Sequence, residues 1–360
     1  MATNTTNKVI KLAVVRDVFQ NHADGMTFQA VCSSREPAMF WGCAQIPDEG
    51  KKQGTLEWKH YNTELPNLDW YTIVDVAELY HPWTLHYIEA RRDHPRLKTF
   101  VTVWDNIPFN RFDPHLTQPI LNYADGFIAR SRLAADCLRI YADPNKIHIV
   151  PAAVDTSLFK PSSKPKKSIS SGSGRKPVVL FAGRVVWEKG IQDLMLAAAG
   201  QDWKLLIAGD GPYVPFISAY AETANIEVEM LGPVPHENMP LVYQQADVLC
   251  YPSIPTQGWI EQFGISVIEA LACGLPVVAS NCGSFLDFEE EAQNYDNDVI
   301  TLTPPMDFSL LRQAIWKSIE ASDDEYVRSS CREMAVNSYS SEVVGKKLHN
   351  VYTGIGSEDA

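Results

Sequence analysis

The 360-residue chain lacks the features that mark secreted, membrane-spanning or nucleic-acid-binding proteins. The first eight residues contain no apolar signal core, and no apolar run approaches the ~18 residues of a membrane span. The seven cysteines are odd in number and form no CxxC pair, which favours reduced thiols over a disulfide framework. The net charge of −13 argues against general binding to nucleic acid, which needs a basic face. These absences predict a cytoplasmic protein.

Motifs for metal or nucleophilic catalysis are also scarce. The chain has no cluster with zinc or calcium ligand spacing, and no GxSxG or Cys/His nucleophile pattern. Asp296-Asn297-Asp298 matches a DxD triplet that could hold a metal and a diphosphate. We interpret it instead as part of an acidic polar loop, from Glu289 to Asp298. We therefore expect neither an essential metal nor a cofactor.

Short apolar strands alternate with helical patterns along most of the chain, which predicts an α/β fold with parallel sheets. Strands are predicted at 9–15, 71–76, 99–104, 126–129, 147–150, 178–182, 204–208, 228–231, 248–251, 276–280 and 300–302. Helices are predicted at 83–92, 114–123, 131–140, 190–199, 213–223, 237–245, 265–273 and 307–321, with two more within 324–353.

A break in composition divides this alternation into two halves. Residues 160–177 are rich in Ser, Pro and Gly and hold six Lys or Arg and no acid, which is typical of a linker. We expect two Rossmann-like domains whose sheets face across a cleft, with ligands at the carboxyl ends of the strands. The predicted parts are an N-terminal domain, a linker, a second domain and a C-terminal helix that packs back on the first domain, at 1–158, 159–177, 178–338 and 339–360.

Two carboxylates, Glu261 and Glu269, flank a Phe-Gly turn that leads into the predicted 265–273 helix. The start of that helix, near Gly264, offers free N–H groups and a positive dipole end, which suit a phosphate. Gly274 suits its C-terminal cap. A carboxylate one turn inside the helix can accept hydrogen bonds from ribose hydroxyls, and one on the loop in front can hold a sugar. The segment is thus arranged like half of a nucleotide-sugar site.

A second loop, from Gly183 to Gly190, follows a strand and carries Arg184 and Lys189 five positions apart. An Arg fork and a Lys point charge can each bind phosphoryl oxygens and neutralise a phosphate leaving group. The alternative is a solvated pair beside Glu188.

Two further strand ends carry turns that could lie against a ligand. Glycines Gly209 and Gly211 allow close approach of backbone, although a plain turn has the same pattern. Pro233 and Val234 could clamp a nucleobase through backbone contacts. We interpret the following His236 as a cap or surface residue before the next helix.

Candidate residues for binding the molecule that accepts the sugar occur in the first half of the chain. Trp104, Asp105 and Asn106 end a strand, and Asp105 could orient the attacking hydroxyl or a sugar hydroxyl, or cap a turn. Asp17, after the first strand, is a weaker case. A basic cluster follows a helix with Trp83, and either it or the 160–176 linker could contact an anionic membrane that carries a lipid-linked acceptor. The alternative is a solvated helix end. The cluster consists of Arg91, Arg92, Arg96 and Lys98.

The order of these motifs resembles the retaining glycosyltransferases of family 4, which have the GT-B fold. The resemblance covers about 121–285. Its motifs are GR(x)4KG at 183–190, Gly-Asp-Gly-Pro at 209–212, Ala-Asp-Val-Leu-Cys-Tyr-Pro-Ser at 246–253, Glu-Gln-Phe-Gly-(x)4-Glu at 261–269, and the segments 124–131 and 149–155.

The resemblance implies specific roles. Arg184 and Lys189 would hold the donor diphosphate, Glu269 the ribose and Glu261 the transferred sugar. The backbone of Phe263, Gly264 and Ile265 would contact sugar and phosphate. Transfer would retain the anomeric configuration without an essential metal.

The chain departs from the family pattern mainly on the acceptor side. Residues 16–25 replace the usual Gly-Gly loop, and Trp104 stands where the family often has His. We expect a glycosyltransferase with a nucleoside diphosphate sugar as donor and a hydroxyl acceptor. The alternatives are a nucleotide-sugar epimerase or hydrolase of the same fold, and a non-catalytic nucleotide-sugar-binding subunit.

Overall fold

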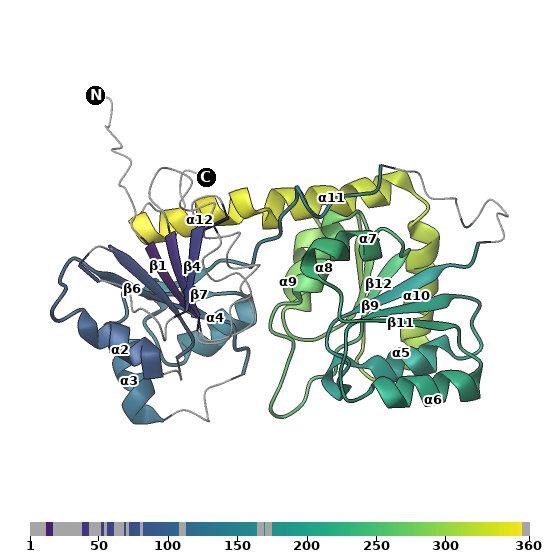
Figure 1. Cartoon of the computed structure of the whole chain (residues 1–360), viewed down its shortest axis with the longest axis horizontal. Coiled ribbons are helices and arrows are strands. Elements are labelled where there is room, and N and C mark those ends of the chain that lie inside the picture. The colour runs from purple at the N-terminus through teal and green to yellow at the C-terminus, as the bar shows by residue number, and fades with distance from the viewer. Residues whose placement is uncertain are drawn as a thin grey trace. The chain divides into compact units, whose positions relative to one another are not determined.

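The computed structural model describes most of the chain and divides it into two compact units. Unit 1 comprises Met1–Ala153 and Ser341–Ala360, and unit 2 comprises Val154–Ser340. Each unit contains its own sheet (Figure 1). The described residues are 12–16, 38–42, 52–53, 56–60, 68–69, 72–79, 82–107, 113–163, 169 and 175–354, with the backbone alone at 15–16, 38–42, 52–53, 56–60 and 82–83.

The sheet of unit 1 has the strand order β3-β4-β2-β1-β5-β6-β7-β8, and only the β3–β4 pair is antiparallel. Its strands are β1 (Leu12–Arg16), β2 (Ala38–Gly42), β3 (Lys52–Gln53), β4 (Leu56–His60), β5 (Ile73–Ala77), β6 (Lys98–Val103), β7 (Gly126–Ala129) and β8 (Ile147–Ile149). Its described helices are α2 (Pro82–Ala90), α3 (Pro114–Tyr123), α4 (Arg132–Arg139), the 3-10 turn η1 (Pro144–Lys146) and α12 (Ser341–Thr353).

Two buried clusters cover the two faces of this sheet. Val74, Val101 and Phe127 pack with α2, α3 and α4, whereas Leu12 and Val14 pack with α12. The Tyr352 hydroxyl of α12 donates a hydrogen bond to the buried Asp75 carboxylate on β5. The last helix therefore completes the core of unit 1.

The sheet of unit 2 is wholly parallel, in the order β11-β10-β9-β12-β13-β14. Its strands are β9 (Val178–Ala182), β10 (Lys204–Ala208), β11 (Val228–Gly232), β12 (Val248–Tyr251), β13 (Val277–Ser280) and β14 (Ile300–Thr303). Its helices are α5 (Ile191–Ala198), α6 (Val214–Ala224), α7 (Met239–Tyr243), α8 (Ile265–Ala272), α9 (Phe285–Ala292), α10 (Phe308–Ala321) and α11 (Glu325–Tyr339), with 3-10 turns η2 (Trp187–Lys189) and η3 (His236–Asn238).

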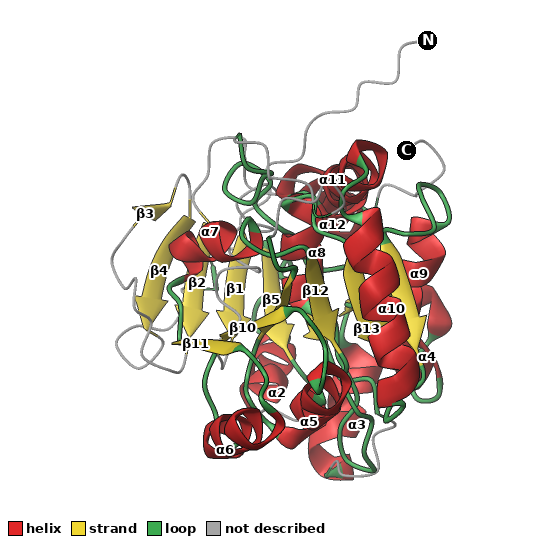
Figure 2. Ribbon diagram, turned by 90° about the vertical axis from the view of Figure 1, so that its right-hand side faces the viewer, coloured by secondary structure: helices red, strands yellow, loops and turns green. Residues whose placement is uncertain are grey.

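The chain winds outward in both directions from the centre of this sheet. From β9 it proceeds to β10 and β11 on one side, and then returns to β12, β13 and β14 on the other. Leu194 of α5 and Ile315 of α10 join Val179 and Phe181 in one core, and α10 lies in front of the sheet in Figure 2. The strand order reverses between β9 and β12, which is where open α/β sheets bind ligands.

Most predicted elements are confirmed, and β7, β9, β10, β12 and α3 have the predicted bounds. Among the elements in the described residues, the strands β2, β3 and β4, the helix α9 and the 3-10 turns η1 and η2 were not predicted. The expectation of a polar loop over 289–298 is therefore wrong in its first part. Residues 289–292 belong to α9, because Phe285, Phe288 and Ala292 bury one face of that helix.

The described ends of the predicted linker are bound to unit 2. Arg175 makes two hydrogen bonds to Asp247, at 2.8 and 2.9 Å, and the backbone N–H of Ile169 donates to Asp323. Phe159 is buried. Only the outer parts of the basic stretch, together with residue 169, lie within the described residues.

Candidate functional site

The loops after β9, β10 and β12 meet at the carboxyl edge of the unit 2 sheet. The N–H of Gly183 donates to Ala208 at 2.9 Å, and the N–H of Ile254 donates to Glu188 at 2.8 Å. A Cβ on Gly209 would lie 1.9 Å from the carbonyl oxygen of Gly183, and one on Gly190 would lie 1.7 Å from that of Pro252. These glycines let three loops pack backbone against backbone.

A buried ion pair links the two loops that the sequence singled out. Lys189 Nζ lies 2.6 Å from Glu261 Oε2, and both residues are under 9% exposed. The hydroxyl of Ser253 donates to the same Oε2 at 2.8 Å. Residues 72 positions apart in the chain therefore form one polar centre.

Two aromatic rings lie close to the Lys189 ammonium. Nζ lies 4.9 Å from the ring centroid of Tyr251 and 4.8 Å from that of Trp259. Burial alone would lower the pKa of Lys189, but the Tyr251 and Glu261 side chains outweigh burial and raise it. The lysine therefore stays charged, as an anion-binding group must.

Arg184 lies on the surface of the same loop. Burial raises the pKa of the Tyr251 phenol, and the charges of Lys189 and Arg184 act against that rise. A Cβ on Gly183 would lie 3.1 Å from the Tyr251 hydroxyl. Arg184 thus lies within electrostatic reach of the ring that contacts Lys189.

Helix α8 begins beside this centre, at the predicted place. Gly264 is its N-cap with φ of 82°, and no described side chain caps it. The Ser266 hydroxyl donates to the carbonyl of Ala182 at 3.0 Å, which fixes the first turn of α8 against the end of β9. Phe263 is buried and Ile265 is half-buried. The positive end of the helix dipole is therefore held near Lys189 and Glu261, where it can bind an anion.

Glu269 lies one turn inside α8 and is 7% exposed. Its Oε2 accepts a 2.7 Å hydrogen bond from the Tyr243 hydroxyl, and its Oε1 lies 3.6 Å from His236 Nδ1. Burial raises the pKa of Glu269 to about 7, and the Tyr243 hydrogen bond acts in the opposite direction. The carboxyl therefore titrates near neutral pH, unlike an ordinary glutamate.

His236, interpreted from the sequence as a cap or surface residue, caps neither η3 nor α7 and is half-buried. No described side chain caps η3, and the imidazole lies against Glu269 and the Phe159 ring instead. The sequence did not assign a role to Tyr243, Tyr251, Ser253 or Trp259, because their roles depend on contacts between distant segments.

Pro233 and Val234 lie in the turn between β11 and η3, just before His236. The amide of Gly211 donates to its neighbour Asp210 at 2.7 Å.

The acceptor-side candidates gather at the carboxyl edge of β6 in unit 1. Trp104 is buried, its N–H donates to Glu78 Oε1 at 3.1 Å, and the Arg130 guanidinium lies 5.1 Å from its ring centroid. Asn106 Oδ1 accepts a 2.6 Å hydrogen bond from Ser131.

Two more acceptor-side residues differ in how far the structure describes them. Burial raises the pKa of Cys137 on α4, and the negative charges of Asp136 and Asp105 raise it further. Asp17 lies outside the described residues. Glu78 was missed by sequence analysis, yet it is buried and has φ of 60° at the end of β5. Such a backbone conformation is unusual for a non-glycine residue and is typical of functional sites.

The DxD triplet is bound within unit 2. Asp298 pairs with Lys317 of α10, and Asp296 accepts the amide of Asp298 at 2.8 Å. Among the described residues there is no group of three or more His, Cys, Asp or Glu side chains placed to share a metal ion.

Several cations considered for membrane contact are already paired. Arg91 lies 3.0 Å from Asp125 and donates to the carbonyl of Tyr123, while Lys176 pairs with Asp202 and Glu227. Within the described part of the chain no helix has the length and apolar character needed to cross a bilayer.

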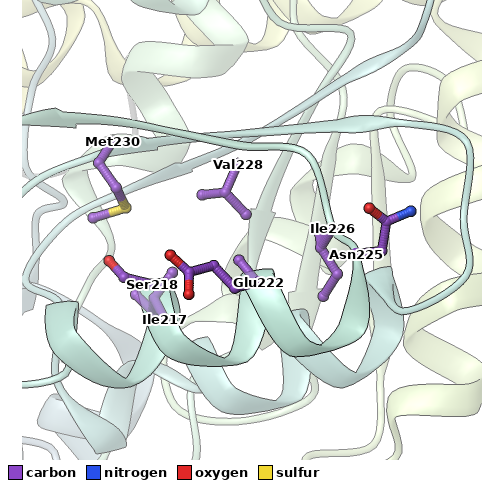
Figure 3. Close-up of a pocket in the computed structure, with 8 residues that line it drawn as sticks. Ile217, Ser218, Glu222, Asn225, Ile226, Val228 and Met230 are labelled. Carbon is purple, nitrogen blue, oxygen red and sulfur yellow. The ribbon is translucent and has the colours of Figure 1, made fainter.

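A separate hollow of about 350 Å³ lies between α6 and β11 (Figure 3). Ile217, Val228 and Met230 line it, with Glu222 at its side. None of the predicted site residues lines this hollow, so it is distinct from the Lys189–Glu261 centre.

Two α/β units with mainly parallel sheets, one of which carries the Lys189–Glu261 centre at its carboxyl edge, define a protein of the GT-B fold. Residues 163–303 match the family model "Glycosyl transferases group 1". The D-inositol 3-phosphate glycosyltransferase of Segniliparus rotundus is 34% identical over 175 residues, which cover 44% of this chain and 38% of that protein. A GPI3 subunit of phosphatidylinositol N-acetylglucosaminyltransferase from Saccharomyces cerevisiae is 27% identical over 229 residues, 61% of this chain and 48% of that protein. The chain thus spans less than half the length of these relatives.

Solved structures share the fold over nearly the whole chain. Anabaena Alr3699/HepE, in complex with UDP and glucose, has a TM-score of 0.74 at 16% identity, covering 96% of this chain and 100% of that one. The sucrose-phosphate synthase of Thermosynechococcus elongatus has a TM-score of 0.71 at 19% identity, covering 96% and 99%. At these identities the likeness establishes the GT-B fold alone, as the sequence predicted.

Proposed function

We propose that the chain is a retaining, family 4-like glycosyltransferase that moves a sugar from a nucleoside diphosphate sugar to a hydroxyl acceptor. The observation that carries the proposal is the buried ion pair between Lys189 and Glu261, 2.6 Å long, in which Glu261 comes four positions before the first residue of α8. It lies within the segment that matches the group 1 glycosyl transferases.

The donor-side roles follow from charge and position. Lys189 and Arg184 bind the diphosphate, together with the amides at the start of α8. They stabilise the negative charge that grows on the leaving phosphate when the sugar–phosphate bond breaks. Two cations and a helix dipole supply this charge from the protein, so we expect no essential metal.

The two carboxylates bind the other parts of the nucleotide sugar. Glu269, when ionised, accepts hydrogen bonds from the ribose hydroxyls. Glu261 accepts hydrogen bonds from hydroxyls of the transferred sugar. Support comes from the neighbouring fold of Alr3699/HepE, whose structure contains UDP and glucose.

The acceptor is assigned to unit 1. Trp104, Asn106 and Glu78, which are buried, and Asp105, which is half-buried, provide a polar group at the ends of β5 and β6. The acceptor hydroxyl attacks on the same face that the phosphate leaves, and the leaving phosphate takes its proton, so the anomeric configuration is retained. We place the reaction in the cytoplasm. A lipid-linked acceptor would bring the enzyme to the inner membrane surface through Arg92, Arg96 and Lys98.

An assay of donor cleavage tests the proposal. The protein is incubated with UDP-, GDP- and ADP-sugars without acceptor, and release of the nucleoside diphosphate is followed with and without chelator. We expect slow hydrolysis of one donor class that chelator does not abolish. Epimerised free sugar would support an epimerase instead, and tight donor binding without any cleavage would support a non-catalytic subunit.

A further inference from the structure

The surroundings of Lys189 hold its ammonium in one place. Two ring centroids lie within 5 Å of Nζ, at 4.9 Å (Tyr251) and 4.8 Å (Trp259), and the Glu261 carboxylate lies at 2.6 Å. The faces of aromatic rings attract a cation without neutralising it. The ammonium can therefore change its anionic partner while the rings keep its position.

The Trp259 ring is itself fixed by a tight turn. The amide of Thr256 donates to the Trp259 carbonyl at 2.7 Å, and the two residues form an isolated antiparallel bridge. The Gly258 amide donates to the Thr256 hydroxyl at 3.3 Å. Trp259 is half-buried and comes two residues before Glu261, so this turn carries the ring to the ammonium.

The charge of the centre is balanced in the ligand-free chain, because one ammonium faces one carboxylate. A diphosphate that reached Lys189 would bring further negative charge beside Glu261. Two anions that share one buried cation repel each other. One of them must give up the ammonium, and Glu261 has a second donor in Ser253, at 2.8 Å.

We propose that Tyr251 and Trp259 form a slot in which the Lys189 ammonium exchanges Glu261 for the donor diphosphate, leaving Glu261 able to accept sugar hydroxyls. This inference rests on the proposed function of the same site. Trp259 is then a positioning residue, which acts on the donor through Lys189. Glu261 competes with a nucleotide that has no sugar and assists one that has a sugar.

Affinity measurements on four proteins test the exchange. Calorimetry measures the binding of UDP, GDP and ADP, all without sugar, to the wild type and to the Glu261→Gln, Trp259→Leu and Trp259→Phe variants. Glu261→Gln should bind the preferred nucleotide roughly fivefold more tightly, because the competing anion is gone. Trp259→Leu should bind it roughly fivefold more weakly, and Trp259→Phe, which keeps a ring, should resemble the wild type.

A second readout is the rate at which an amine-specific reagent labels Lys189 in the ligand-free protein, followed by mass spectrometry. The neutral amine is the nucleophile that attacks such reagents, so Lys189 should be labelled several times faster in Trp259→Leu than in wild type, and Trp259→Phe should not differ from wild type. Lys204 of β10, paired with Glu229 of β11, is the internal reference. Trp187→Leu removes an exposed indole from the same loop and should leave the Lys189 rate unchanged.

Unchanged or weaker nucleotide binding in Glu261→Gln would overturn the exchange. Equal labelling in Trp259→Leu and wild type would overturn the slot. If Glu261→Gln does not fold, Glu261→Asp, which draws the carboxylate back by one methylene, should show a smaller gain in affinity. If the wild type binds none of the three nucleotides, the proposed function fails, while the labelling contrast still decides whether the rings hold the ammonium.

Discussion

Single residues at this edge carry opposing demands of stability and binding. Glu269 is buried beside Tyr243 and His236, and its pKa is raised to about 7. Burial of a carboxyl group costs free energy of folding once the group is ionised, which is the form in which we propose that Glu269 binds ribose. Sites kept for binding commonly have this kind of local cost.

Glu269→Gln should make the protein more stable at alkaline pH and little changed at pH 5. The native state holds the Glu269 proton up to about pH 7, whereas the unfolded state releases it near 4.5, so wild-type stability falls as pH rises through that window. Above pH 7 the free energy of unfolding of Glu269→Gln should exceed that of the wild type by about 3 kcal/mol. Denaturant unfolding of both proteins at pH 5 and pH 8 measures it. Equal stability at pH 8 would show that the Glu269 pKa is not raised.

The aromatic residues of the site show where sequence-based reasoning stops. Glu261, Glu269, Arg184 and Lys189 were selected from the sequence because charged residues at strand ends and a helix start have direct chemical meanings. Trp259 and Tyr251 were not, because an aromatic residue after a strand usually packs in a core. Only the tertiary contacts place their rings beside Lys189.

Among the elements, the loops between β9 and α5 and after β12 depend on backbone contact. Gly190 has φ of 69° and leaves no room for a Cβ beside Pro252. Gly200 has nearly the same φ, 72°, but nothing lies within 4 Å of a Cβ there. Substitutions at the two glycines therefore distinguish the cost of backbone strain alone from the cost of strain together with a steric clash.

Gly190→Ala should destabilise the protein by several kcal/mol and abolish nucleotide binding. Gly200→Ala should cost only about 1–2 kcal/mol from the left-handed conformation and leave binding intact. Thermal unfolding and calorimetry with the preferred nucleotide measure both effects. Similar losses in the two variants would mean that the contact with Pro252 has no special importance.

Regular apolar segments were predictable and irregular ones were not. Strands β9 and β12 are continuous apolar runs, so their bounds followed from the sequence. Strand β4 alternates polar and apolar residues near a sheet edge, and β3 has two residues. Helix α9 was hidden because acids at 289–291 suggested a loop, while Phe285 and Phe288 provide its buried face.

For the molecule as a whole, the chain returns to unit 1 after completing unit 2. Val344, Leu348 and Tyr352 of α12 join the core that contains Leu12 and Val14. The Tyr352 hydroxyl and the Thr102 hydroxyl both donate to the Asp75 carboxylate. Chain ends far apart in sequence thus stabilise one sheet. The residues that we propose to bind the nucleotide sugar lie wholly within unit 2.

Tyr352→Phe should destabilise unit 1 by about 1–3 kcal/mol, because a buried carboxylate loses one of its donors. Nucleotide affinity should not change, since every residue that we propose to bind the nucleotide sugar lies in unit 2. Calorimetric unfolding and nucleotide titration of the same preparation measure the two quantities. A large drop in affinity would contradict the assignment of donor binding to unit 2 alone.

The central claim is that Lys189, held beside Glu261 and the start of α8, binds the diphosphate of a nucleotide sugar. Calorimetric titration of wild type, Lys189→Met and Lys204→Met with UDP-, GDP- and ADP-glucose tests it most directly. We predict saturable binding of at least one donor to wild type and Lys204→Met, and ~100-fold weaker binding to a folded Lys189→Met. Equal affinity in wild type and Lys189→Met, or no binding of any donor to the wild type, would contradict the account.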